Sequence, residues 1–199
     1  DKKTDSKPVQ EDSKNFRPDV FSPRLQYRPR IDLNCKWSLR RDAKGIGKKE
    51  GWHQGKGAFP DSMSVPGAPQ AQSIGEPHKL QRTMFMEPFW IRRSFLLPKI
   101  DPADRVWLRL GGVLPAAEVY VNGQYVGYTK SSRTAERVDI TEMAKAGGEN
   151  LIVIKVCELP KVRLDGLLEW NEGTQKWMGP YRPIYCEIVN EVSLSDAYV

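Results

Sequence analysis

The densest group of side chains able to do chemistry lies in an irregular segment, residues 160–179, where carboxylates are interleaved with tryptophans. Its members are Asp165, Glu169, Trp170, Glu172 and Trp177. Carboxylate oxygens accept hydrogen bonds from sugar hydroxyls, and the flat face of an indole covers the apolar face of a pyranose. A paired-carboxylate hydrolase would also need two acids held about 5 Å or about 6.5 to 9.5 Å apart, which nothing on one irregular segment provides. The segment is a structural loop or a sugar contact, and we expect no catalytic residue in it.

Other catalytic signals are weaker still. An Asn-Glu pair such as Asn171-Glu172 marks the acid/base of many glycosidases, but there it ends a barrel strand, and this sequence has no barrel pattern. The two histidines, His53 and His78, stand beside no credible nucleophile. Dinucleotide and phosphate-loop motifs are missing as well. We therefore expect no cofactor and no metal site.

Composition excludes two classes of partner. The 199 residues include 31 Lys and Arg against 25 Asp and Glu, a net charge of +6. The basic residues are scattered singly among acids, without a cluster or an RNA-binding aromatic motif, so no nucleic-acid partner is expected. Apolar runs are only a few residues long, against the roughly 18 that a membrane-spanning helix needs, so no transmembrane segment is predicted.

The cysteines and the first residues of the sequence indicate in which cellular compartment the protein is expected. Cys35, Cys157 and Cys186 allow at most one internal disulfide and lack metal-ligand spacing, so we expect buried or idle thiols. The sequence starts with Asp-Lys-Lys-Thr-Asp-Ser-Lys and not with Met, as it would after removal of a signal or lipoprotein segment. This start predicts export to the periplasm, the medium or a lipid anchor outside the cytoplasm.

The sequence divides into a tail and one domain. Residues 1–28 are rich in charge and proline and poor in bulky apolar side chains, so we expect a mobile or loosely docked tail. Residues 29–199 form the domain. Within it, residues 41–82 lack periodicity and predict a long loop region with one short strand at Met63–Pro66.

Short strands are predicted at 34–40, 89–97, 105–110, 118–121, 124–128, 151–158 and 184–189. Alternation places on one face Cys35, Trp37 and Leu39 in the first, Val106, Leu108 and Leu110 in the third, and Ile184, Cys186 and Ile188 in the last, with Tyr185 and Glu187 outward. Asp139 with Glu142 resembles a helix start, but Gly147-Gly148 leaves space for one or two turns only. Such a series of strands predicts an all-β, antiparallel β-sandwich.

The dipeptide Asn122-Gly123 gives the strongest local prediction. It stands between two strand patterns, and it best tolerates the two positive φ angles of a type I′ turn. We therefore expect a tight hairpin, with Asn122 and Gly123 in a structural role.

From Phe89 onward, six pieces follow one another in a specific order over about 105 residues. They are residues 88–95 (PFWIRRSF), 105–113 (RVWLRLGGV), 117–128 (AEVYVNGQYVGY) with 131–133 (SSR), 138–141 (VDIT), 148–153 (GENLIV) and 179–184 (GPYRPI). Together they resemble the N-terminal sugar-binding domain of glycoside hydrolase family 2, the family of β-galactosidases and β-glucuronidases. Trp52 and residues 64–67 (SVPG) resemble the family's upstream pieces more loosely. Two departures, Pro180 and residues 131–137, concern subfamily and substrate rather than fold.

The resemblance implies a jelly-roll sandwich of the galactose-binding-like type. In this family the domain precedes an immunoglobulin-like domain and a (β/α)₈ barrel that carries both catalytic glutamates, and this chain stops near where the second domain would start. It implies a noncatalytic accessory domain of an exported glycosidase that shapes the substrate cleft and has carbohydrate and the other two domains as partners. The alternative is a stand-alone carbohydrate-binding or adhesion module.

Among the matched residues, Arg182 stands on the approach to the last strand. We expect its planar guanidinium, in a partly buried position, to hold a loop carboxylate or carbonyl groups.

Overall fold

A computed structural model of the chain describes residues 29–72, 74, 87–129, 134–157 and 178–190. The predicted tail, residues 1–28, lies outside the described residues. In the described part the chain forms strands, two short 3₁₀ turns and no α-helix.

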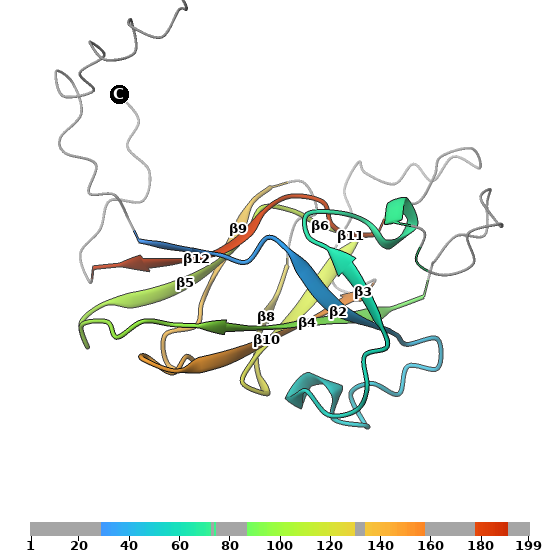
Figure 1. The fold of residues 1–199 in the computed structure, drawn as a ribbon, viewed down its shortest axis with the longest axis horizontal. Coiled ribbons are helices and arrows are strands. Elements are labelled where there is room, and N and C mark those ends of the chain that lie inside the picture. The colour runs from blue at the N-terminus through green and yellow to red at the C-terminus, as the bar shows by residue number, and fades with distance from the viewer. Residues whose placement is uncertain (1–28, 73, 75–86, 130–133, 158–177, 191–199) are drawn as a thin grey trace, which may run out of the picture.

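Every strand pair is antiparallel, and the strands form two main sheets. The four-stranded sheet contains, in spatial order, β1 (Arg30–Asp32), β12 (Ile184–Val189), β5 (Arg105–Leu110) and β9 (Glu136–Asp139). The six-stranded sheet contains β3 (Asp61–Ser64), β2 (Lys36–Arg41), β4 (Phe89–Leu96), β10 (Glu149–Cys157), β7 (Ala116–Val121) and β8 (Gln124–Tyr128). A small pair joins β11 (Gly179–Pro180) to β6 (Val113–Leu114), and the 3₁₀ turns are η3 (Trp52–Gln54) and η4 (Pro69–Gln72). Figure 1 shows the sheets as two layers, with β1 and β12 side by side although they lie at opposite ends of the described chain.

The main core fills the space between the two sheets. Val106, Leu108 and Leu110 of β5 are buried in it, as their alternation predicted. Ile184, Cys186 and Ile188 of β12 join the same core, while β2 and β4 contribute alternate residues from the opposite layer. The antiparallel sandwich predicted from the sequence is confirmed.

Strand β10 lies between β4 and β7 at the middle of the larger sheet. Ile152, Ile154 and Val156 face the main core, whereas Val153 packs in a second apolar cluster on the opposite face of the sheet. The strand predicted at 151–158 is therefore β10, which begins two residues earlier, and the second cluster means that this sheet is covered on both faces.

The hairpin between β7 and β8 turns at the predicted dipeptide. Asn122 has φ of 51° and Gly123 has φ of 84°, as a type I′ turn requires. The Asn122 side chain does more than permit the turn. Its Nδ2 donates to the Met143 carbonyl oxygen at 2.7 Å and to Asn150 Oδ1 at 2.9 Å, and its Oδ1 accepts from the Leu151 amide at 3.0 Å. The hairpin is thereby fastened to the loop that precedes β10.

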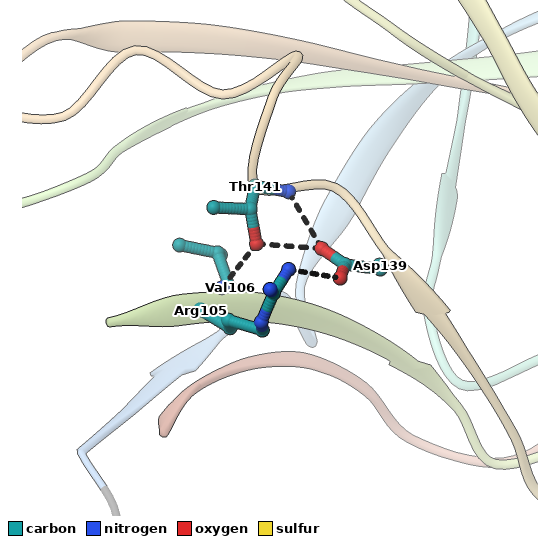
Figure 2. A network of polar contacts seen from close by, with 4 residues as sticks. All are labelled: Arg105, Val106, Asp139 and Thr141. Carbon is teal, nitrogen blue, oxygen red and sulfur yellow. Dashed lines mark hydrogen bonds and ion pairs between the residues drawn. The ribbon is translucent and has the colours of Figure 1, made fainter. Parts of the chain in front are cut away.

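The predicted helix start at Asp139 is a tight turn. Figure 2 shows Asp139 Oδ1 accepting from the Thr141 amide, while the Thr141 hydroxyl accepts from the Val106 amide at 2.9 Å. Arg105 approaches the other carboxylate oxygen of Asp139 at 3.4 Å. One turn of helical hydrogen bonding follows, in which the Met143 and Ala144 amides both donate to the Ile140 carbonyl. These contacts tie the end of β9 to β5, so the carboxylate closes a turn instead of starting a helix.

The burial of two side chains differs from what the alternation of their strands led us to expect. Cys35 was expected on the face of Trp37 and Leu39, but it is exposed because the strand begins only at Lys36 and Cys35 lies in the bend before it. Glu187 points away from the main core, as predicted, yet it is buried: Arg109 Nε lies 2.7 Å from one carboxylate oxygen and Arg30 3.0 Å from the other. Two cations allow this carboxylate to lose its contact with water.

The other cysteines are buried, and no disulfide joins the three. The region predicted as one long loop, residues 41–82, contains η3, β3 and η4 in its described part. Its short strand, predicted at Met63–Pro66, is β3, which begins two residues earlier and pairs with β2.

Replacing Gly123 with Ala should destabilise the domain by about 1 to 2 kcal/mol, because an L-residue is strained at this positive φ. A Cβ there would also approach Gln54 Cγ to 3.2 Å. Gly148→Ala is the matched control, since its Cβ would meet nothing closer than 3.6 Å and the change should be neutral or slightly stabilising. Urea unfolding measures both, and equal midpoints would contradict the turn assignment.

Stability should fall at alkaline pH because burial raises the pKa of the Cys186 thiol from 9.0 to about 12. The folded state keeps this proton while the unfolded state loses it. The stabilisation of the folded state by the protonated Cys186 thiol is therefore complete below about pH 9. It decreases by about 1.4 kcal/mol per pH unit as the pH rises toward 12. Cys186→Ala should flatten this part of the pH dependence in urea unfolding at about pH 8 and about pH 10.5. Cys35→Ala, at an exposed thiol, should leave the wild-type slope.

Candidate functional site

The residues with the strongest sugar-contact chemistry in the sequence lie outside the described residues. They are Asp165, Glu169, Trp170, Glu172 and Trp177. The described residues on either side of them return to one place in the fold: Cys157 pairs with Ala116, and Gly179 pairs with Leu114. The segment that carries these residues therefore starts and ends beside residues 113–117. A further bond, from the Gly67 amide to the Pro180 carbonyl at 2.8 Å, fixes the C-terminal flank.

Arg182 is exposed, which contradicts the partly buried position expected for it. Its guanidinium carbon lies 5.4 Å from the ring centroid of Tyr181. The reason is geometric: Arg182 precedes β12, where the chain has not yet entered the sheet, so the inward alternation of that strand begins only at Ile184.

The outer face of the six-stranded sheet is partly covered by residues 42–59. Trp52, from η3, packs edge-on against Trp90 of β4, with ring centroids 6.2 Å apart. Trp90 lies 5.7 Å from Tyr120 of β7, and Val153 completes this second cluster. Phe59 packs against its rim. The cluster excludes water from the outer side of β4, β10 and β7.

Two arginines on the sheet hold the covering segment from below. The Arg40 guanidinium lies 3.7 Å from the centre of the Trp52 ring, and that of Arg92 lies 4.2 Å from the centre of the Phe59 ring. Arg92 also donates to the Gly55 carbonyl oxygen. Stacking a guanidinium on an aromatic face keeps the cation favourable where water is partly excluded.

A buried carboxylate fixes the start of the same segment. Asp42 accepts hydrogen bonds from the Ile46 amide at 2.7 Å, from the Gly47 amide at 3.1 Å and from Trp90 Nε1 at 2.8 Å. Gly47 is required there because a Cβ would collide with the indoles of Trp90 and Trp52. Asp42 thus joins a loop to the sheet by satisfying donors on both, which is why its charge is tolerated inside the protein.

The apolar part of the cover ends at β7, and Lys48 is the side chain of the segment that reaches Tyr125 on the edge strand β8. Tyr120 donates its hydroxyl proton to Glu118, and Lys155 lies 3.8 Å from the same carboxylate. Burial, together with this hydrogen bond, raises the pKa of Tyr120, so the phenol stays protonated. Beyond them Tyr125 and Tyr128 are exposed, by 50% and 38%.

His53 approaches the same cluster from η3. Its ring lies 5.3 Å from that of Tyr120, and its Nδ1 atom is buried with no hydrogen-bond partner among the described residues. Among the residues that the structure describes, no group of three or more metal-ligating side chains comes together. The described part of the chain also contains no helix long and apolar enough to cross a membrane.

Sequence reasoning missed this outer cluster. The strand at 89–97 was predicted correctly, but its outward residues, Trp90 and Arg92, received no role. Trp90 and Arg92, a tryptophan and an arginine at alternate positions of one short strand and on the face opposite the core, were the available signal. Asp42 gave none, because a single acid in a Gly-rich, charged stretch looks like an ordinary loop residue.

The fold and this surface define a class of protein, the galactose-binding-like jelly-roll sandwich. The sequence profile of the "Glycosyl hydrolases family 2, sugar binding domain" matches residues 31–178. The chain therefore belongs to this family, and the resemblance noted in its sequence is confirmed.

Several relatives are enzymes of this family. The chain is 29% identical over 141 residues to a β-galactosidase of Thermoanaerobacter pseudethanolicus, covering 69% of this chain and 18% of the relative. It is 28% identical over 125 residues to a β-glucuronidase of Paenibacillus borealis, covering 63% and 20%. A solved β-glucuronidase from Ruminococcus gnavus, in complex with D-glucaro 1,5-lactone, matches with a TM-score of 0.68 and 27% identity over 83% of this chain and 30% of that one. The chain matches about a fifth of the length of these curated relatives.

Replacing Asp42 with Ala should cost about 3 kcal/mol of unfolding free energy, because it leaves the Trp90 indole and two backbone amides without an acceptor. Urea unfolding followed by tryptophan fluorescence measures the loss. The control is Asp61→Ala at an exposed position, which should stay within about 0.5 kcal/mol of the wild type. Equal stability of the two variants would show that Asp42 does not anchor the segment.

Proposed function

We propose that this chain is a noncatalytic accessory domain of an exported family 2 glycoside hydrolase, where it helps to shape the substrate cleft. The observation that carries the proposal is the family match over residues 31–178 together with the small share of the relatives that the chain covers. In the family both catalytic glutamates belong to a barrel domain, and the partners of this domain would be that barrel and the intervening immunoglobulin-like domain.

The sandwich suits a framing role. Its two sheets are joined through one core, and its turns are closed by side-chain hydrogen bonds such as those of Asn122 and Asp139. Loops that connect strands of such a rigid sandwich have both their ends held in place by the sheets. The segment between Cys157 and Gly179 is one of these, and we propose that its carboxylates and indoles contact a sugar at the edge of the cleft. Export, the remaining part of the proposal, is testable by fractionating the cells that make the protein.

The chain by itself should hydrolyse no nitrophenyl glycoside and should bind monosaccharides only weakly. Loop contacts cover few faces of a sugar, and a Kd of 1 mM corresponds to only about 4 kcal/mol. Galactose, glucose and glucuronic acid are titrated against the ¹⁵N-labelled chain while the indole N–H signals of Trp170 and Trp177, assigned from Trp→Phe variants, are followed.

Movement of those two signals at millimolar sugar supports the proposed contact, and no movement at tens of millimolar contradicts it. Glu172→Gln provides the catalytic control: turnover by the pure chain that this variant abolishes would overturn the noncatalytic assignment.

A further inference from the structure

We propose that the open part of the six-stranded sheet's outer face binds an extended β-1,4-linked oligosaccharide. This surface, the tyrosine strip, consists of Glu118, Tyr125, Tyr128 and Lys155. The inference rests on the proposed function in that it takes the domain to meet carbohydrate, and it adds a place and a chain geometry that the family assignment does not contain.

The register of the sheet places the members of the strip on one face. Tyr128 pairs with Glu118, and Glu118 pairs with Lys155. Lys155 in turn pairs with Trp90, which belongs to the outer cluster. Directly cross-strand neighbours share a face, so this row lies on the outside. The parallel row runs from Val153 through Tyr120 to Tyr125.

A β-bulge puts both tyrosines on that face. Val119 pairs with Gly127 and Tyr120 pairs with Tyr125, so Val126 is an extra residue on β8. In a regular strand, residues three apart point to opposite faces. Here Val126 packs against the main core, while Tyr125 and Tyr128 both point outward. Bulges re-aim side chains in this way, often beside functional sites.

The exposure of these rings stands out. Four large apolar or aromatic side chains are exposed in the described residues, and two of them are Tyr125 and Tyr128 on the same short strand. The apolar side chains of residues 42–59 cover the neighbouring strands, and Lys48 of this segment reaches the Tyr125 ring. Tyr125 touches the second cluster edge-on through Tyr120, with ring centroids 5.5 Å apart, and still stays exposed. Exposed aromatic side chains that share a face provide the kind of contiguous apolar surface that interaction sites use.

The spacing suits a chain of sugars. Three residues of extended strand span about 10 Å at about 3.3 Å per residue, somewhat less across a bulge. That is comparable to the length of a disaccharide. In a β-1,4-linked chain successive pyranoses are inverted, so every second ring presents the same face. Two tyrosines at this separation can therefore meet two equivalent ring faces of one extended chain.

Polar groups around the rings suit hydroxyl recognition. Glu118, in the first row, accepts from Tyr120 of the second row and lies 3.8 Å from the Lys155 ammonium. Lys48, from the covering segment, places its ammonium 6.0 Å from the centre of the Tyr125 ring. A carboxylate and two ammonium groups offer both acceptors and donors to the hydroxyl groups of such a ligand.

The test is an NMR titration of the full ¹⁵N-labelled chain with cellohexaose. We expect saturable movement of the Tyr125 and Tyr128 backbone signals. Tyr125→Ala and Tyr128→Ala should each weaken binding about tenfold, equivalent to about 1.4 kcal/mol. Tyr125→Phe should retain binding, since the ring remains. Leu96→Ala, at an exposed apolar residue on β4, is the matched control and should bind as the wild type does.

Several results would overturn the inference: no saturable shift, an affinity unchanged in both Tyr→Ala variants, or equal affinity for the α-linked maltohexaose. Light scattering that showed a dimer abolished by Tyr125→Ala would assign the strip to a second copy of the chain instead. The same spectra report the indole signals of Trp170 and Trp177. Movement there with none at the strip would leave the proposed function standing and refute this inference. Movement at the strip with none at the two indoles would support this inference and count only against the sugar contact proposed for Trp170 and Trp177.

Discussion

The architecture depends on the burial of both faces of β10. One face sends Ile152, Ile154 and Val156 into the main core, and the other sends Val153 into a second cluster with Trp52, Trp90 and Tyr120. An apolar strand of this kind needs a cover on each side. The four-stranded sheet provides one, and residues 42–59 provide the other. A two-layer sandwich therefore becomes three layers thick over its central strands.

The second cover is held by polar and cationic contacts as much as by apolar ones. Asp42 bonds to Trp90 and to two loop amides, and Arg40 and Arg92 stack under Trp52 and Phe59. Such contacts are directional, so they fix where the segment lies. The apolar part of the cover reaches as far as β7, and Tyr125 and Tyr128 of β8 stay exposed beyond it. The position where residues 42–59 end therefore determines which part of the outer face of the six-stranded sheet is exposed.

Several charged and polar side chains connect strands and turns of the sandwich and are not simply exposed on its surface. Glu187 is buried between two arginines on the outer side of the smaller sheet, and Asp139 closes the turn after β9. Asn122 links the hairpin to the loop before β10. Each links elements that are distant in sequence. These contacts hold the ends of the strands and turns in defined positions.

Much of the strand and turn structure could be predicted from the sequence, because it depends on preferences of neighbouring residues. The alternation in β5 and β12 reports burial on one side of a strand, and Asn122-Gly123 reports a turn, because both patterns reflect steric preferences of neighbouring residues. The ordered motifs from Phe89 to Ile184 were sufficient to indicate the family. The sequence also presented Asp165 to Trp177 as sugar-contact chemistry, although those residues lie outside the described part of the chain.

Tertiary structure determined the rest, because it depends on contacts between residues far apart in the chain. Asp42 looks like a loop residue until Trp90, 48 positions away, donates to it. Glu187 is buried only because Arg30 and Arg109 converge on it, and Arg182 is exposed because its strand has not yet begun. Tyr125 and Tyr128 share a face only through a bulge that strict alternation cannot reveal. Pairing register and the path of a covering segment are collective properties, and no local pattern records them.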